Sequence, residues 1–278
     1  MHSYVREGLT FDVTDEGPAD GRVVILLHGF PEDRLCWSGV IPQLTEAGYR
    51  VLAPDQRGYS PGARPKGRRP YAMTELSADV LALADVAGAD RFDVVGHDWG
   101  GGVAWDLAAN HQKRVRTVTS LATPHPRAMQ DAFRHSRQLL HSWYMLFFQI
   151  PKLPEAVMKA AGFDRSVQQF EKDGLDPESA RRYARRMQDP KAMTGPVNWY
   201  RALPFSARTP IPTVDRPTLY VYGAGDRYLT RYSAERTGHY VTGPYRFEVL
   251  EGMSHWLPSG AAEPVGSLLK DHLAAHPD

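Results

Sequence analysis

The sequence has little cysteine and no long apolar run. One cysteine, Cys36, occurs in 278 residues, which excludes a disulfide within the chain and is compatible with a reducing compartment. No stretch approaches the roughly 20 apolar residues that a membrane-spanning helix requires. The first residues show no basic segment followed by an apolar run, so we expect no signal peptide and a cytoplasmic location.

The sequence also lacks an excess of charge of either sign. Its 33 Lys and Arg residues and 32 Asp and Glu residues leave a formal net charge of +1. This balance gives no reason to expect a nucleic acid or a membrane as a partner. Hydrophobic residues make up 42% of the chain, enough for a sizeable core in one α/β domain with an insertion.

Short apolar segments alternate with segments of helical character over most of the chain. Residues 23–27, Val-Val-Ile-Leu-Leu, are apolar throughout, as expected for a strand that is covered on both faces. The alternation predicts a mostly parallel, doubly wound sheet. We expect strands at Val23–His28, Arg50–Pro54, Arg91–Gly96, Val115–Leu121, Thr218–Tyr222 and Tyr245–Leu250, and helices near Trp37–Ala47, Met73–Ala87 and Trp99–Asn110.

This alternation stops between about residues 123 and 212. Helix-like stretches, aromatic residues and prolines replace the strand signals there, which indicates a helical cap inserted into the α/β core. We assign residues 1–122 and 211–278 to the core and 123–210 to the cap, with 208–212 as the returning linker. Four cap arginines share one helix face, which we expect to be solvated: Arg181, Arg182, Arg185 and Arg186.

The most informative segment is Gly-His-Asp-Trp-Gly at 96–100. It lies between a predicted strand and a predicted helix, which is the setting of a nucleophile elbow. Small residues must flank the nucleophile in such a strained turn, and glycine provides them. Asp98 stands where serine is usual, and a carboxylate is already ionised at neutral pH and needs no base to activate it. Alone, this pattern is also compatible with an aspartate that caps a helix.

Three further segments occur in the chain order expected of an elbow enzyme, one before the elbow and two after it. The loop His28–Glu32 offers the amide of Phe30, which together with the amide of Trp99 predicts a two-donor oxyanion hole. Asp226 lies in a glycine-containing turn after one predicted strand, and His255 lies in a loop after the next. Strand ends at one sheet edge bind ligands in this architecture. The joint arrangement favours a catalytic triad over an unrelated turn aspartate and loop histidine.

The chain resembles α/β-hydrolases of the epoxide hydrolase group, whose nucleophile is an aspartate and which are related to the haloalkane dehalogenases. The resemblance spans most of the chain and implies the α/β-hydrolase fold. One departure is that a proline often follows the triad acid of the family, whereas Asp226 is followed by Arg-Tyr-Leu-Thr. The matching segments are His28–Glu32, Asp55–Ser60, Gly96–Gly101, Asn198–Arg201 and Ser254–Trp256.

The same resemblance implies an activity. In that group two cap tyrosines hold the epoxide oxygen, and Tyr144 and Tyr200 match them. The expected reaction converts an epoxide to a 1,2-diol through an ester on Asp98, which water activated by His255 and Asp226 then hydrolyses. It requires no metal and no cofactor, and its partners are a small apolar epoxide and water. Expected substrate-binding residues are Pro31, Trp143, Phe147 and Trp199.

Two other activities remain open at this point. A haloalkane or haloacid dehalogenase would use the same Asp98 ester, but the tyrosine pair favours epoxides. Dehalogenases of these kinds also generally carry a polar residue at the position of Phe30 or an arginine at that of Trp99. A non-catalytic ligand receptor is disfavoured because the triad is intact, and a serine esterase is excluded because no serine occupies an elbow. The chain is expected to be a monomer or a homodimer.

Overall fold

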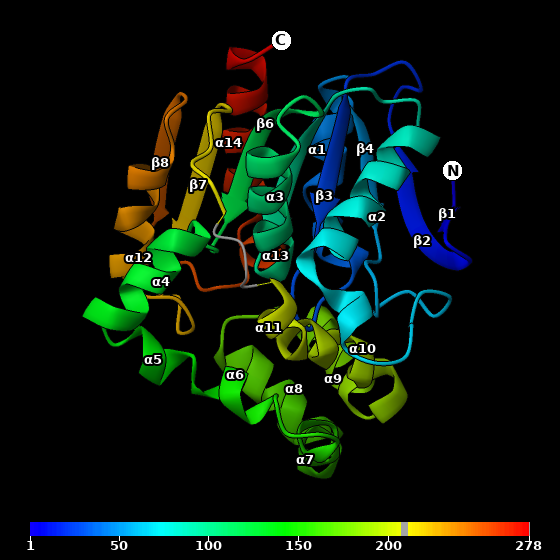
Figure 1. Cartoon of the computed structure of the whole chain (residues 1–278), viewed down its shortest axis with the longest axis vertical. Helices are drawn as coiled ribbons and strands as arrows, with labels where there is room; N and C mark the ends of the chain where they lie inside the picture. Colours follow the sequence, from blue (N-terminus) through cyan, green and yellow to red (C-terminus); the bar gives the residue numbers. More distant parts are fainter. Residues whose placement is uncertain (207–210, 278) are drawn as a thin grey trace.

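The core of the molecule is a twisted sheet that lies between two layers of helices (Figure 1). The computed structural model describes residues 1–206 and 211–277. Within these residues the sheet has eight strands in the order β1-β2-β4-β3-β5-β6-β7-β8. β2 pairs antiparallel with β1 and β4, and the other neighbours are parallel. The strands are β1 (Ser3–Arg6), β2 (Leu9–Glu16), β3 (Val23–Leu27), β4 (Arg50–Pro54), β5 (Phe92–His97), β6 (Val115–Leu121), β7 (Thr218–Gly223) and β8 (Tyr245–Leu250).

The predicted fold class is confirmed, and each of the six predicted strands is present with ends shifted by at most one residue. β3 and β5 are buried along their whole length, which explains the unbroken apolar sequence of β3. The sequence analysis missed β1 and β2, which form the antiparallel edge. In β2 only Phe11 and Val13 are buried, so its signal is a short alternation rather than an apolar run.

Helices cover both faces of the sheet. α2 (Met73–Val86) and α3 (Trp99–Asn110) pack together on one face, and α1 (Ile41–Glu46) and α14 (Ala262–Ala275) pack together on the other (Figure 1). The helices predicted at 73–87 and 99–110 are confirmed. The helix predicted at 37–47 is instead a 3₁₀ turn, Arg34–Trp37, followed by α1, with Pro42 in the first turn of α1, a position that proline favours.

The chain between β6 and β7 is helical, as expected, and most of it lies beyond one end of the sheet (Figure 1). α4 packs against α12 (Arg231–Arg236) of the core. The predicted cap end at 210 and residues 208–210 of the predicted linker lie outside the described residues. The helices of this region are α4 (Pro126–His135), α5 (Gln138–His141), α6 (Trp143–Phe147), α7 (Leu153–Ala161), α8 (Phe163–Lys172), α9 (Pro177–Met187), α10 (Pro190–Arg201) and α11 (Leu203–Ser206).

The prediction of a solvated arginine face on α9 is wrong for two of its four members. Arg182 Nε donates to Asp33 Oδ1 at 3.0 Å, and Arg186 Nη2 donates to Asp33 Oδ2 at 3.2 Å. Arg186 also donates to the backbone carbonyl of Glu32 and lies over the ring of Tyr59. The helix turns these two guanidinium groups toward the core because the buried carboxylate of Asp33 requires charge partners. They therefore join the cap to the loop that follows β3.

Two glycines allow the turn between β5 and α3 to approach the rest of the sheet. A Cβ on Gly100 would lie 2.2 Å from the carbonyl oxygen of Leu27 in β3, and one on Gly96 would lie 2.1 Å from that of Gly100. Neither neighbour is a flexible side chain, so the backbone itself would have to move. A Cβ on Gly102, two residues further along α3, would meet only Met73 Cε at 3.6 Å.

We therefore expect Gly100→Ala to lower the free energy of unfolding by about 3 kcal/mol, because the new methyl group overlaps backbone atoms. Gly102→Ala is the matched control in the same helix. It should be neutral or stabilising, by up to about 1 kcal/mol, since alanine favours helix over glycine. Chemical denaturation of both variants measures the difference. Equal stability of the two would contradict this account of the turn.

Candidate active site

Asp98 occupies the elbow in a backbone conformation that non-glycine residues rarely adopt, with φ of 49° and ψ of −119°. Its amide donates to the carbonyl of Leu121, and its own carbonyl accepts from Thr123 Oγ1 at 2.6 Å and from the amide of Gly102. These bonds join the elbow to the end of β6 and to the first turn of α3. The side chain of Asp98 is 19% exposed, so it remains accessible from the cavity described below.

The loop after β3 places a hydrogen-bond donor on this carboxylate. The amide of Phe30 donates to Asp98 Oδ1 at 2.7 Å. The approach requires Gly29, because a Cβ there would lie 2.4 Å from Asp98 Cβ. Trp99 begins α3, so its amide belongs to the first turn, where backbone donors have no partner within the helix. Its role as the second oxyanion donor stays a prediction.

His255 and Asp226 come together beside Asp98, although 29 residues separate them from each other and more than a hundred separate either of them from Asp98. His255 Nδ1 lies 2.7 Å from Asp226 Oδ2, and His255 Nε2 lies 3.7 Å from Asp98 Oδ2. The second oxygen of Asp226 accepts the amides of Tyr228 and Leu229. Both oxygens of Asp226 therefore have a hydrogen-bond partner. The charged group near Asp98 Oδ2, His255 Nε2, lies beyond hydrogen-bond distance.

The carboxylates around His255 control its pKa. Burial alone would lower it, but the charge and hydrogen bond of Asp226 and the charges of Asp98 and Glu32 outweigh burial and raise it to about 9. The ring is therefore protonated at neutral pH. Loss of the Asp98 charge removes one of the causes of this shift.

A buried ion pair connects the oxyanion loop to the histidine loop. His97 Nε2 donates to the carbonyl of His255 at 2.8 Å, and His97 Nδ1 lies 2.7 Å from Glu32 Oε2. Burial would raise the pKa of Glu32, but His97 and the amide of Gly29 outweigh burial and lower it. Both ring nitrogens of His97 therefore face acceptors. Sequence analysis quoted these two residues within motifs without assigning them a role.

Tyr144 of α6 and Tyr200 of α10 lie across the cavity from the carboxylate. Their ring centroids are 5.9 Å apart at an interplanar angle of 75°. Burial raises the pKa of both phenols well above the usual value, and the negative charge of Asp98 adds to the shift. Both phenols are therefore protonated at neutral pH and can donate a hydrogen bond to an oxygen that develops charge.

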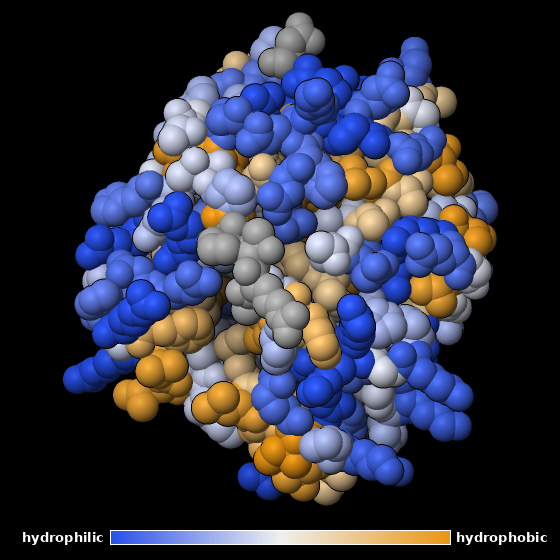
Figure 2. Space-filling model, viewed as in Figure 1, coloured by the Kyte–Doolittle hydropathy of each residue, from blue (hydrophilic) through white to orange (hydrophobic). Residues whose placement is uncertain are grey.

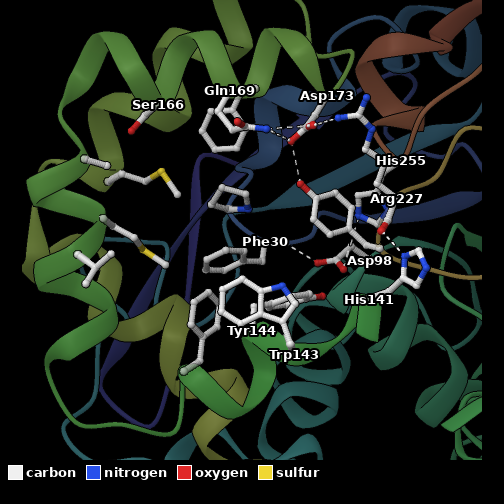
Figure 3. Close-up of a pocket in the computed structure, with 18 of the residues that line it drawn as sticks. Phe30, Asp98, His141, Trp143, Tyr144, Ser166, Gln169, Asp173, Arg227 and His255 are labelled. Carbon is white, nitrogen blue, oxygen red and sulfur yellow. Dashed lines mark hydrogen bonds and ion pairs between the residues drawn. The ribbon is translucent and has the colours of Figure 1, made fainter. Parts of the chain in front are cut away.

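Asp98, His255, Tyr144 and Tyr200 line a cavity of about 570 Å³ between cap and core (Figure 3). Of the predicted substrate-binding residues, Pro31 and Trp143 line it. Trp199 does not, which corrects the prediction: its ring is buried in the main core and its Nε1 donates to the carbonyl of Arg57. Phe147 does not line it either, because it packs against Trp143 and Phe148.

The loop after Asp226 supplies cavity residues that sequence analysis did not single out (Figure 3). Tyr228 packs its ring edge-on against His255, at 4.9 Å between centroids, and its hydroxyl donates to Asp173 Oδ2 at 3.1 Å. Asp173 follows α8 of the cap and also pairs with Arg227. The position of Tyr228, two residues after Asp226, could have identified it as a cavity residue from the sequence. Nothing in the sequence points to Asp173, because its partner Tyr228 is distant in the chain.

No group of three or more His, Cys, Asp or Glu residues that could hold a metal ion occurs among the described residues. No helix in the described part of the chain is long and apolar enough to cross a membrane. Besides the carboxylate, the imidazole and the phenols given above, the polar residues that line the cavity include His141, Arg165, Ser166, Gln169, Asp173 and Arg227.

The sequence pattern of the α/β-hydrolase fold family matches residues 22–259. The chain is 34% identical over 272 residues to an AB hydrolase superfamily protein of Bacillus subtilis, covering 96% of this chain and 95% of that protein. It is 33% identical over 307 residues to epoxide hydrolase A of Mycobacterium tuberculosis, covering 96% and 94%.

A solved structure agrees with these sequence relatives. The crystal structure of epoxide hydrolase A from Mycobacterium thermoresistibile superposes with a TM-score of 0.85 at 29% identity, covering 98% of this chain and 97% of that one. The chain belongs to the α/β-hydrolase fold family. Several of its relatives and structural neighbours within that family are named epoxide hydrolases.

The raised pKa of His255 predicts a pH dependence of stability. The pKa is about 9 in the folded protein and 6.5 for an ordinary histidine. The folded state therefore holds the proton more tightly, and this contribution is fully present below about pH 6.5 and is lost as the pH rises through 9. We expect the free energy of unfolding to fall over that interval, and to fall less in His255→Gln, when both are measured by urea denaturation. Parallel declines would contradict the shift.

Proposed function

We propose that this chain, an epoxide hydrolase, opens its substrate by forming an ester on Asp98. The observation that carries the proposal is the placement of the Asp98 carboxylate between an amide donor, a histidine–aspartate pair and two protonated phenols. A serine in the elbow would require His255 to remove its proton first. Asp98 does not, so the histidine is left for the second step.

In the first step the two oxygens of Asp98 have different tasks. Oδ1 accepts the amide of Phe30, whereas Oδ2 has no hydrogen-bond donor among the described residues and is the nucleophile. Oδ2 forms a bond to one epoxide carbon while the ring C–O bond breaks, and the electron pair of that bond stays on the epoxide oxygen. Tyr144 and Tyr200 hydrogen-bond this oxygen, and one of them gives it a proton.

In the second step water hydrolyses the ester. Once Asp98 is esterified its charge is gone, so the pKa of His255 falls and the ring gives up its proton, which restores the ionised tyrosine and leaves Nε2 available as a base. Nε2 takes a proton from water, whose oxygen attacks the carbonyl carbon of Asp98. The resulting oxyanion lies at Oδ1, where the amide of Phe30 stabilises it; one such donor is worth about 3 kcal/mol of barrier. Collapse breaks the bond between the carbonyl carbon and Oδ2, and the leaving alkoxide takes the second proton of the water from the new carboxyl group. This releases the diol and leaves the carboxylate of Asp98 and a protonated His255.

The cavity indicates the substrate class. Its volume of about 570 Å³ suits a small molecule. Aromatic and methionine side chains dominate the wall beside the two tyrosines, so we propose a small apolar epoxide with water as co-substrate. We further propose a cytoplasmic location, on the ground that the single cysteine, Cys36, is free and buried.

The ester intermediate can be trapped. We expect His255→Gln to gain the mass of a whole epoxide when it is incubated with a panel of apolar epoxides, because ring opening proceeds and hydrolysis does not. Intact-mass spectrometry measures the gain, and Asp98→Asn, which lacks the nucleophile, is the control. A gain of an alkyl group alone from alkyl halides would indicate a dehalogenase instead, and an adduct in Asp98→Asn would refute the assigned nucleophile.

The two phenols should matter for ring opening. We expect the double variant Tyr144→Phe/Tyr200→Phe to slow formation of the ester by about 10²–10⁴-fold, the usual contribution of a positioned proton donor. Each single variant should lose less, since one phenol remains. Single-turnover quenching of the fluorescence of Trp99, next to Asp98, measures the rate. Tyr232→Phe, on α12 with its hydroxyl on Asp131, is the matched control, and an unchanged rate in the double variant would remove both tyrosines from the mechanism.

A further inference from the structure

Exposed apolar side chains are concentrated in one short part of the cap. Ten large hydrophobic residues are exposed among the described residues, and seven of them lie between 139 and 157. Leu139, Leu140, Trp143 and Leu146 are exposed by 60%, 71%, 64% and 76%. In Figure 2 the apolar groups form the lower edge of the molecule, over α5, α6 and α7 of Figure 1. A patch of this kind on a water-soluble surface indicates an interaction site.

The same surface forms the mouth of the catalytic cavity. Leu140, Trp143 and Val157 are exposed and also line that cavity. Ile150 and Leu153, exposed by 44% and 43%, continue the apolar surface between α6 and α7. We call residues 139–157 the docking face. Whatever covers the docking face also meets the entrance through which a substrate reaches Asp98.

The charge of this region differs from that of the whole chain. Residues 132–163 contain four Lys or Arg and one acid, Glu155. Glu155 is buried and paired with Arg201, so it offers no charge to a partner. Asp131, at the edge of the region, pairs with Arg236 and His135. The four cations are exposed: Arg134, Arg137, Lys152 and Lys159.

We propose that the docking face binds the surface of an anionic phospholipid bilayer. Exposed leucines and a tryptophan, with exposed lysines and arginines close to them in the chain, are the chemistry of interfacial binding, in which apolar groups enter the headgroup boundary and cations meet lipid phosphates. A second copy of the chain is a poorer occupant, because a twofold contact would set the same cations against themselves. The chain-wide net charge of +1 conceals this surface because it averages over both faces of the molecule.

Docking would place the cavity mouth against the lipid, where apolar molecules accumulate. This consequence rests on the proposed function, since it has the enzyme take an apolar epoxide directly from the bilayer. The binding itself does not depend on catalysis. Asp98→Asn, which should be inactive, should bind vesicles as the unaltered protein does, so failure of the reaction and failure of docking are distinguishable.

Vesicle sedimentation tests the proposal. We expect the protein to bind vesicles of equimolar phosphatidylcholine and phosphatidylglycerol, and to bind pure phosphatidylcholine vesicles and all vesicles at high salt more weakly. Leu139→Ser/Leu146→Ser should lower partitioning to the anionic vesicles by about tenfold or more, since two apolar side chains no longer enter the boundary. Neither leucine lines the cavity, so hydrolysis of a water-soluble epoxide should be unchanged.

Matched variants elsewhere on the surface give the controls. Val86→Ser removes an exposed apolar side chain from α2, and Lys113→Gln removes an exposed cation from the loop after α3; both should bind as the unaltered protein does, whereas Lys152→Gln/Lys159→Gln should bind more weakly. Absence of vesicle binding, or equal binding by all variants, would overturn the proposal. So would a homodimer, detected by light scattering, that dissociates in Leu139→Ser/Leu146→Ser without any lipid binding.

Discussion

The geometry of the site depends on the backbone of Asp98. A non-glycine residue at φ 49° and ψ −119° costs about 1–3 kcal/mol, and the surroundings must supply that energy. They do so through the bonds of Asp98 to Leu121 and Thr123, and through two close approaches that only glycine permits, at Gly29 and Gly100. In return, the carboxylate stands clear of the helix that follows it. One of its oxygens is held by an amide, and the other faces the cavity.

Ion pairs and hydrogen bonds hold the neighbouring loops and the cap in place around Asp98. The pair formed by Glu32 and His97 is fully buried and connects the oxyanion loop to the backbone of His255. Removal of either partner would leave the other buried and uncompensated, at a cost of about 3–5 kcal/mol. Two polar contacts join the cap to the core near the site. Arg186 of the cap donates to Asp33, and the hydroxyl of Tyr228 donates to Asp173 of the cap. The loop that carries Asp226 is therefore hydrogen-bonded to the cap.

Local patterns were sufficient for the elements that build the core. Unbroken apolar runs such as 23–27 identify buried parallel strands, and the glycine-flanked Asp98 identifies the elbow. They were insufficient where one residue has two plausible environments. As an aromatic residue of the cap, Trp199 was predicted to line the cavity, but its indole donates to the carbonyl of Arg57 and lies in the core. Arg182 and Arg186 were predicted to lie on a solvated helix face, but both form ion pairs with the buried carboxylate of Asp33.

The sequence by itself determined the α/β class, and it predicted Asp98 as the nucleophile and the chain order nucleophile, acid, histidine. Each of these depends on a short segment whose spacing has a local physical cause. Only the tertiary structure decided which aromatic residues face the cavity, that Tyr228 packs on His255, and that the pKa of His255 lies near 9. Those properties arise from groups that are distant in the chain and adjacent in space. Their energies depend on burial and separation, which a linear pattern does not contain.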